Sequence, residues 1–210
     1  MKNKTLKSFL LLAATFALSI VFFTLQSFRS ENKSVLDNTI SDFSLKNVDE
    51  KTISLSDYKN AKGFIIVFTC NHCPFAKLYS QRFNDLNTKY SSLGVPLLAI
   101  NSMDTAMYED ESFINMKNKS TTEIFNFPYL CDNMQTVGKN FGADHTPHAY
   151  VIWKENNKWK IKYSGAIDDN GEEPKKATPY VANAVTELLE NKQVSMPVTV
   201  SVGCKIFFRK

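Results

Sequence analysis

The sequence predicts an α/β protein in which helices cover both faces of a central sheet. Two runs, "GFIIVFT" at 63–69 and "VPLLAINS" at 95–102, are almost continuously apolar, which is typical of strands buried on both faces. Between them, apolar side chains recur at helical spacing over 73–90. Because buried strands alternate with helical segments, a sheet packed between two helical layers is the expected arrangement.

The composition favours one globular domain that does not depend on disulfides for stability. The chain has 210 residues, of which 43% are hydrophobic. A folded body of roughly 150–170 residues can bury enough apolar surface without covalent links. Residues 1–30 contain four basic residues and no acidic ones, which leaves 21 bases against 21 acids in the rest of the chain. A neutral body lacks the basic face that binding to nucleic acid requires.

Residues 1–30 are interpreted as a signal peptide or an N-terminal membrane anchor. A basic start, "MKNKTLK", precedes 18 uncharged residues at 8–25. As a helix this run would span about 27 Å, close to the roughly 30 Å of a bilayer core. Both interpretations stay open, and both predict export to a periplasmic or other extracytoplasmic location, with anchoring to the inner membrane if the segment is uncleaved. Disulfides persist in such compartments.

The remaining chain is predicted to consist of a linker at 31–38, a folded domain at 39–193 and a C-terminal extension at 194–210. The expected elements, in order, are a β-hairpin at 41–58, a strand at 63–69, a helix at 73–90, a strand at 95–102, a helical insertion at 107–127, strands at 128–130, 148–153 and 157–167, and a helix at 178–192. No structure is predicted for the extension.

The sequence "TCNHCP" places Cys70 and Cys73 where a buried strand gives way to a helix. A structural disulfide, half of a zinc site and a redox centre are the alternatives. A helix N-terminus stabilises a thiolate, so this position predicts a lowered pKa for Cys70. Zinc would need a second ligand pair, and the sequence contains no second CxxC. The placement therefore favours a redox pair, with His72 adjusting the stability of the thiolate.

Three motifs resemble the redoxin proteins of the AhpC/TSA kind within the thioredoxin-like superfamily. The segment 41–58 resembles their opening hairpin, and "GADHTPHAYVI" resembles their cis-proline loop. The ending "VSVGCKIFF" resembles the Gly-Cys-x-Ile ending of a bacterial subgroup with Asn-His between its paired cysteines. The resemblance covers about residues 39–208. It implies a thioredoxin-like fold, with a central mixed sheet flanked by helices and a helical insertion before the cis-proline loop.

The CxxC pair and the resemblance together predict an exported thiol–disulfide oxidoreductase. Cys70 would attack a substrate disulfide and Cys73 would resolve the mixed disulfide. The resemblance implies that Pro147 is cis and that the backbone of Thr146 pairs with an extended substrate. Protein or small-molecule disulfides and thiols are the expected substrates, together with an electron donor or acceptor that the sequence does not name. No cofactor is expected.

The two other cysteines have less defined roles. Cys204 matches the tail motif of the subgroup, and it is either a structural thiol or an auxiliary redox partner. Cys131 is interpreted as a small buried residue. The four cysteines allow three complete pairings, which spacing alone does not separate.

Two further functions compete with disulfide exchange. The first is a peroxiredoxin-like antioxidant peroxidase that uses Cys70, with Cys73 or Cys204 resolving. Peroxiredoxins carry a proline seven residues and a threonine three residues before the attacking cysteine, but Gly63 and Val67 stand there before Cys70.

The second is a Cu(I)-binding or metallochaperone module, with Cys70, Cys73, His145 and His148 as ligands. The subgroup has a cysteine where His145 stands, which is a departure from its pattern. The acidic run at 108–111 is interpreted as solvated surface, and Asp168 and Asp169 as turn residues.

Overall fold

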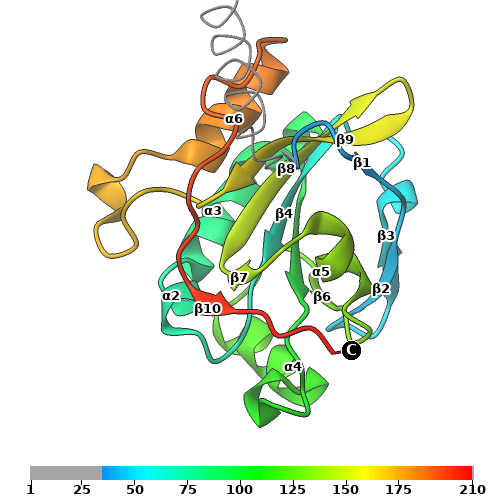
Figure 1. The fold of residues 1–210 in the computed structure, drawn as a ribbon, viewed down its shortest axis with the longest axis vertical. Coiled ribbons are helices and arrows are strands. Elements are labelled where there is room, and N and C mark those ends of the chain that lie inside the picture. The colour runs from blue at the N-terminus through cyan, green and yellow to red at the C-terminus, as the bar shows by residue number, and fades with distance from the viewer. Residues whose placement is uncertain (1–34, 210) are drawn as a thin grey trace, which may run out of the picture. The chain divides into compact units, whose positions relative to one another are not determined.

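A computed structural model describes residues 35–209. Its centre is a mixed sheet with strand order β1-β9-β8-β4-β5-β6-β2-β3 (Figure 1). Strands β4, β5 and β6 run parallel, whereas β8 runs antiparallel to β4. The strands are β1 (Thr39–Ile40), β2 (Ser44–Asn47), β3 (Thr52–Ser54), β4 (Gly63–Phe68), β5 (Leu97–Asn101), β6 (Tyr129–Cys131), β7 (His145–Thr146), β8 (His148–Glu155), β9 (Lys158–Gly165) and β10 (Cys204–Lys205).

Strand β4 lies in the middle of the sheet, between β8 and β5, and all six of its residues are buried. Its side chains alternate between two cores, as strand geometry requires. Phe64, Ile66 and Phe68 pack into one core, while Ile65 and Val67 pack into the other. The prediction of a strand buried on both faces is confirmed.

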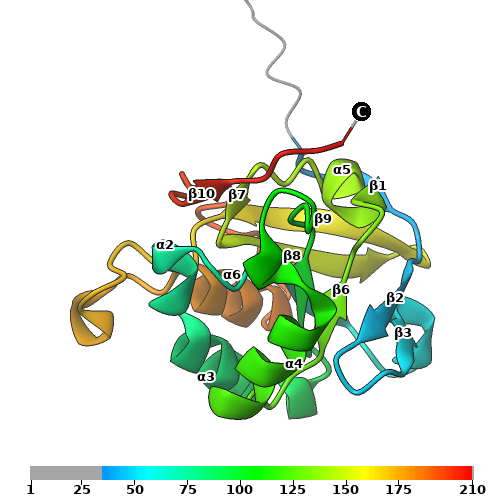
Figure 2. The same cartoon turned by 90° about the horizontal axis from the view of Figure 1, so that it is seen from below.

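Helices cover both faces of the sheet (Figure 2). Helices α3 (Ser80–Tyr90) and α6 (Tyr180–Leu189) bury their apolar side chains in the core that contains Ile65, whereas α5 (Thr136–Phe141) packs into the core that contains Phe64. The helical layers and the mixed sheet are those that the resemblance implied.

The predicted helix at 73–90 is divided into α2 (Pro74–Lys77) and α3. At the junction the amides of Leu78 and Tyr79 donate to carbonyls three residues back rather than four. This tighter turn interrupts the helix. As a result Phe75 and Leu78 are 46% and 45% exposed, although their spacing predicted a buried face.

The hairpin and the insertion have the predicted structure. Strands β2 and β3 pair antiparallel, and the insertion contains a 3₁₀ turn at Glu109–Glu111 followed by α4 (Phe113–Thr122). The predicted signal or anchor at 8–25 lies outside the described residues. Within residues 35–209, no helix combines the length and hydropathy needed to cross a membrane.

The C-terminal extension packs along one end of the domain. Val198 forms a bridge with Ser164 of β9, and β10 then pairs antiparallel with β7 (Figures 1 and 2). Ile206 is buried at 2% exposure, and its amide donates to the carbonyl of Asp144. The extension therefore holds a fixed position beside the loop that contains Thr146 and Pro147.

Candidate active site

The CxxC pair lies at the predicted junction between strand and helix. The amide of Thr69 continues the β4–β5 ladder by donating to Ile100, and Cys70 follows directly. Cys73 is the N-cap of α2, and Pro74 is its first residue, where a missing N–H costs no helical hydrogen bond. Both cysteines are free thiols, and both are fully buried.

Thr146 contacts both sulfurs of the pair. Its Oγ1 lies 3.0 Å from Sγ of Cys70, and its carbonyl oxygen lies 3.1 Å from Sγ of Cys73, which donates when protonated. The peptide bond between Thr146 and Pro147 is cis, as the resemblance implied. The structure thus brings together Cys70, Cys73, Thr146 and Pro147, although Cys70 and Thr146 are 76 residues apart in the sequence.

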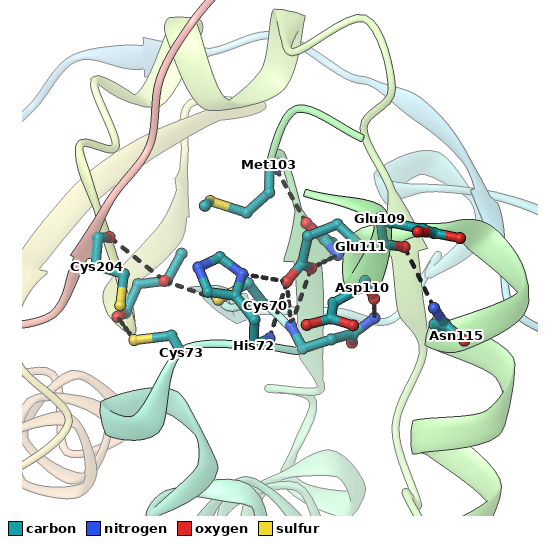
Figure 3. Close-up of polar contacts among 12 residues, drawn as sticks. Cys70, His72, Cys73, Met103, Glu109, Asp110, Glu111, Asn115 and Cys204 are labelled. Carbon is teal, nitrogen blue, oxygen red and sulfur yellow. Dashed lines mark hydrogen bonds and ion pairs between the residues drawn. The ribbon is translucent and has the colours of Figure 1, made fainter. Parts of the chain in front are cut away.

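Glu111, which no sequence pattern singled out, has its side chain buried directly beside Cys70. Its carboxylate accepts hydrogen bonds from the backbone amides of Asn71 and His72, at 2.9–3.0 Å, and from Nδ2 of Asn101 at 2.6 Å (Figure 3). The prediction that the whole run 108–111 is solvated surface is therefore wrong. A buried carboxylate must be paired or fully hydrogen-bonded, and the turn between the two cysteines supplies the donors.

His72 points to Glu111 rather than to a cysteine sulfur. Its Nδ1 lies 2.6 Å from Oε1 of Glu111, and its ring stacks on Tyr108 with centroids 4.4 Å apart. Two residues of the insertion therefore hold the imidazole in place. The amine of Lys119, also from the insertion, donates to the carbonyl of Cys70 at 3.3 Å.

The two thiols of the pair ionise very differently. A hydrogen bond with Cys73, burial and the charge of Glu111 raise the pKa of Cys70 well above its usual range. The pKa of Cys73 is lowered to about 4, chiefly by the hydrogen bond that the Cys70 thiol donates and then by Cys204 and the amide of Ala76, while burial opposes this. In the reduced pair the direction of the shift in pKa for Cys70 is therefore opposite to the predicted lowering.

Two physical reasons account for this difference. Helix α2 contains only four residues, so its dipole is small, and the residue at its N-cap is Cys73 rather than Cys70. In addition, the carboxylate of Glu111 lies beside Cys70 and repels a second negative charge there.

Cys204 contacts the pair from the C-terminal extension. In Figure 3 its sulfur points toward Cys73, and its carbonyl accepts a hydrogen bond from Oγ1 of Thr146 at 3.4 Å. Burial, together with the hydrogen bond and charge of Cys73, raises the pKa of Cys204 to about 11. Cys131, by contrast, lies at the end of β6, is partly exposed and has a pKa raised mainly by burial.

The predicted copper ligands do not form one cluster. His145 pairs with Asp144 at 2.7 Å, and Nε2 of His148 lies 3.1 Å from Oγ of Ser164. Among residues 35–209, one group of three ligand atoms lies within 4.8 Å of one another, and it consists of Cys70, His72 and Glu111. In that group the imidazole and the carboxylate already bond to each other.

A groove of about 650 Å³ lies beside Pro147. The exposed side chains of Phe75 and Leu78 line one part of it, and the exposed Val200 and Val202 of the extension line another. The loop at 168–172 also lines the groove.

Asp168 has a larger role than the turn residue that was predicted. It is 6% exposed and pairs with Arg82 at 2.6 Å, and Arg82 also donates to the carbonyls of Asn170 and Gly171. Asp169 accepts a hydrogen bond from the amide of Thr178. The pairing with Arg82 fixes the loop that borders the groove.

Residues 36–164 match the model of the AhpC/TSA family. The chain belongs to the AhpC/TSA family. This match covers most of the sheet and both cysteines of the pair. No curated protein gives a significant match to the chain.

Solved structures share the fold of this AhpC/TSA-family protein. A hypothetical protein, SMc02350 from Sinorhizobium meliloti 1021, superposes with a TM-score of 0.75 at 27% identity, covering 83% of this chain and 94% of that one. An uncharacterized conserved protein from Geobacillus kaustophilus gives 0.74 at 34% identity, covering 83% and 92%. The lipoprotein thioredoxin Etrx1 from Streptococcus pneumoniae strain TIGR4 gives 0.54 at 18% identity, covering 72% and 99%. The fold is thioredoxin-like.

Proposed function

We propose that this protein is a thiol–disulfide oxidoreductase whose redox pair is Cys70 and Cys73. The observation that carries the proposal is that Thr146 contacts both sulfurs of the pair, at 3.0 and 3.1 Å, directly before its cis peptide bond with Pro147. Neighbouring thiols form a disulfide without a large backbone movement, and the backbone of Thr146 lies where an extended substrate strand would pair.

The different ionisation of the two sulfurs suggests how the first step proceeds. The pair shares one proton, and when that proton lies on Cys73 the Cys70 sulfur is the thiolate that attacks a substrate disulfide. The substrate S–S bond breaks, one substrate sulfur leaves as a thiolate, and a mixed disulfide with Cys70 remains.

The second step closes the Cys70–Cys73 disulfide. Cys73 releases its proton and attacks the Cys70 sulfur, and the second substrate sulfur leaves. Two electrons have then passed from the pair to the substrate. The reverse sequence oxidises a substrate dithiol, so the redox partner in the cell sets the direction.

Polar contacts from the insertion stabilise the turn between the two cysteines. Glu111 fixes the amides of Asn71 and His72, and Lys119 holds the carbonyl of Cys70. A reacting sulfur needs such fixed surroundings, since small displacements lower the rate of a bimolecular exchange. The apolar groove beside Pro147 is suited to bind the side chains that flank a substrate cysteine.

We also propose that the domain works outside the cytoplasm, because the basic, apolar start at 1–25 has the composition of an export signal or anchor. Fusing alkaline phosphatase after residue 38 tests this in a bacterial host. Phosphatase activity is expected, whereas an inactive, cytoplasmic fusion would contradict export.

Trapping tests the proposed chemistry. In Cys73→Ser the mixed disulfide with Cys70 cannot be resolved, so adducts with protein substrates should accumulate and be released by dithiothreitol. Cys131→Ser is the matched control and should trap nothing. Reduction of insulin by the unmodified protein is expected, and its absence together with fast consumption of hydrogen peroxide would favour the peroxidase function instead.

A further inference from the structure

The C-terminal extension occupies the backbone edge at which the proposed function would place a substrate. Strand β10 pairs with β7 so that Cys204 lies opposite Thr146 and Lys205 opposite His145. Gly203 permits this approach, because a Cβ atom there would overlap the carbonyl oxygen of Thr146. A strand of the chain itself therefore takes the position of an extended peptide substrate.

Contacts on both sides hold β10 in this position. Before it, the amide of Ser164 donates to Pro197 and the amide of Thr199 donates to Ser164, at 3.0 and 3.1 Å. After it, the amide of Ile206 donates to Asp144, and Nε2 of Gln135 donates to the carbonyl of Phe207, both at 2.8 Å. The pairing of β10 with β7 is therefore held by hydrogen bonds to the domain on both sides.

This register places a third thiol next to the redox pair. The side chain of Cys204 contacts Cys73, and its backbone amide also contributes to holding the Cys73 thiolate. Cys73 therefore has two sulfurs as neighbours, those of Cys70 and Cys204. A substrate cysteine on a strand paired with Thr146 would have the same placement.

We propose that Cys204 is a third redox residue, which exchanges with the Cys70–Cys73 disulfide so that the extension acts as an internal substrate. This rests on the proposed function of the pair. In the step, Cys204 loses its proton and attacks Sγ of Cys73. The Cys73–Cys204 bond forms, the Cys70–Cys73 bond breaks, and Cys70 leaves as a thiolate that takes up the proton. No external oxidant or reductant is consumed.

The charge of Cys73 opposes ionisation of Cys204 while the pair is reduced, and this effect ends when the pair is oxidised. Burial is the main cause of the raised pKa of Cys204, and the hydrogen bond and charge of Cys73 add to it. Formation of the Cys70–Cys73 disulfide removes the hydrogen bond and the charge of Cys73, while the smaller effect of the Glu111 charge remains. Cys204 then ionises more readily and becomes a better attacking group.

The product would differ from the ordinary oxidised enzyme in two ways. Cys70 would again be a free thiol, and a covalent bond would hold the extension across the docking edge. The same edge could not pair with another strand until that bond was reduced or exchanged back.

Disulfide mapping with three matched variants tests the proposal. Trypsin releases Cys70 and Cys73 together in peptide 63–77 and Cys204 in peptide 193–205. Cys131→Ser protein is oxidised with trans-4,5-dihydroxy-1,2-dithiane, blocked with N-ethylmaleimide at low pH, and digested. A cross-link between the two peptides is expected. It should persist in Cys70→Ser/Cys131→Ser and be lost in Cys73→Ser/Cys131→Ser, with circular dichroism showing that each variant is folded.

The outcomes separate this proposal from the one on which it rests. If peptide 63–77 contains only its internal disulfide, no cross-link forms in any variant, and insulin is still reduced, then the role of Cys204 is wrong and the function of the pair stands. A cross-link of equal yield in Cys73→Ser/Cys131→Ser would also overturn the proposal. If neither the internal disulfide nor insulin reduction is seen, the proposed function itself fails.

Discussion

Nδ1 of His72 lies 2.6 Å from Oε1 of Glu111, and Glu111 is only 1% exposed. This pair joins the turn between the two cysteines to the insertion before α4, 39 residues away in sequence. The insertion is therefore part of the candidate site, and changes in it should affect the chemistry of Cys70.

Replacing Glu111 by Gln should destabilise the protein and lower the pKa of Cys70. An amide cannot accept all of the bonds that the carboxylate accepts, and hydrogen bonds to a charged group each contribute about 1.5–3 kcal/mol. Loss of the negative charge removes one of the causes that raise the pKa of Cys70. Urea unfolding and the pH dependence of iodoacetamide alkylation measure the two effects.

The exposed neighbour Glu109 provides the control for this variant. Glu109→Gln should leave both the free energy of unfolding and the alkylation profile unchanged. Equal effects of the two substitutions would show that general surface charge, rather than the buried carboxylate, governs Cys70.

Near neutral pH, the reduction potential of the pair should fall by about 30 mV for each unit that the pH rises. If both thiols took up protons on reduction, the fall would be about 59 mV per unit. The lowered pKa of Cys73, about 4, keeps this sulfur ionised above that pH, while the raised pKa of Cys70 keeps the other protonated. Reduction then takes up one proton instead of two. As the pH falls through the Cys73 pKa, the second proton binds and the slope doubles.

Equilibration with redox buffers of known potential, followed by alkylation and mass spectrometry, measures this slope. A slope near 59 mV per unit at neutral pH would mean that both thiols are protonated there. In that case the charge assigned to Cys73 would be wrong.

Leu78→Ser should weaken the use of protein substrates without slowing exchange with a small disulfide. Leu78 is 45% exposed and lines the groove beside Pro147. Loss of one partly buried leucine contact costs about 1 kcal/mol, or roughly a fivefold rise in KM. Insulin and 5,5′-dithiobis(2-nitrobenzoate) serve as the two substrates.

Leu93 is a close match for this experiment, since it is 46% exposed and lies in a different surface turn, Ser91–Leu93. Leu93→Ser should affect neither substrate. A similar rise in KM in both variants would show that the groove is not part of the docking surface.

Gly203→Ala should detach β10 from β7 and expose the buried pair. The added methyl group overlaps the carbonyl of Thr146. Because one or two backbone hydrogen bonds are lost, β10 should be detached about ten times more often. A bulky maleimide should then alkylate the cysteines about tenfold faster. Met196→Ala, at an exposed position of the same extension outside the groove, is the control and should leave the rate unchanged. An unaltered rate in Gly203→Ala would indicate that the extension does not protect the sulfurs.

The features that depend on nearby residues were predictable from the sequence. The buried strand, the turn with its two cysteines and the Thr146–Pro147 loop all carry local signals, namely hydrophobic runs, a fixed spacing and a motif. The structure places these segments as expected. The interruption between α2 and α3 could not be predicted, since the apolar spacing continues across it.

Glu111 could not be predicted because its burial depends on contacts with distant residues. Nothing in "YEDE" separates the buried acid from its two acidic neighbours, and its partners Asn71 and Asn101 lie in other segments. The same contact adds to the raised pKa of Cys70, after the hydrogen bond with Cys73 and burial. The position of the extension was missed for a related reason, because a short irregular segment has no periodicity and pairs only through its tertiary partners.

The attachment of the extension on both sides of β10 has a consequence for selectivity. A tethered segment competes with incoming ligands at an effective concentration that dilution does not change, on the order of millimolar for short tethers. Its hydrogen bonds at Ser164 and at Asp144 keep Cys204 close to Thr146 at every protein concentration. A polypeptide that binds weakly would not displace the extension. Only a polypeptide with substantial additional affinity would reach the reactive sulfurs.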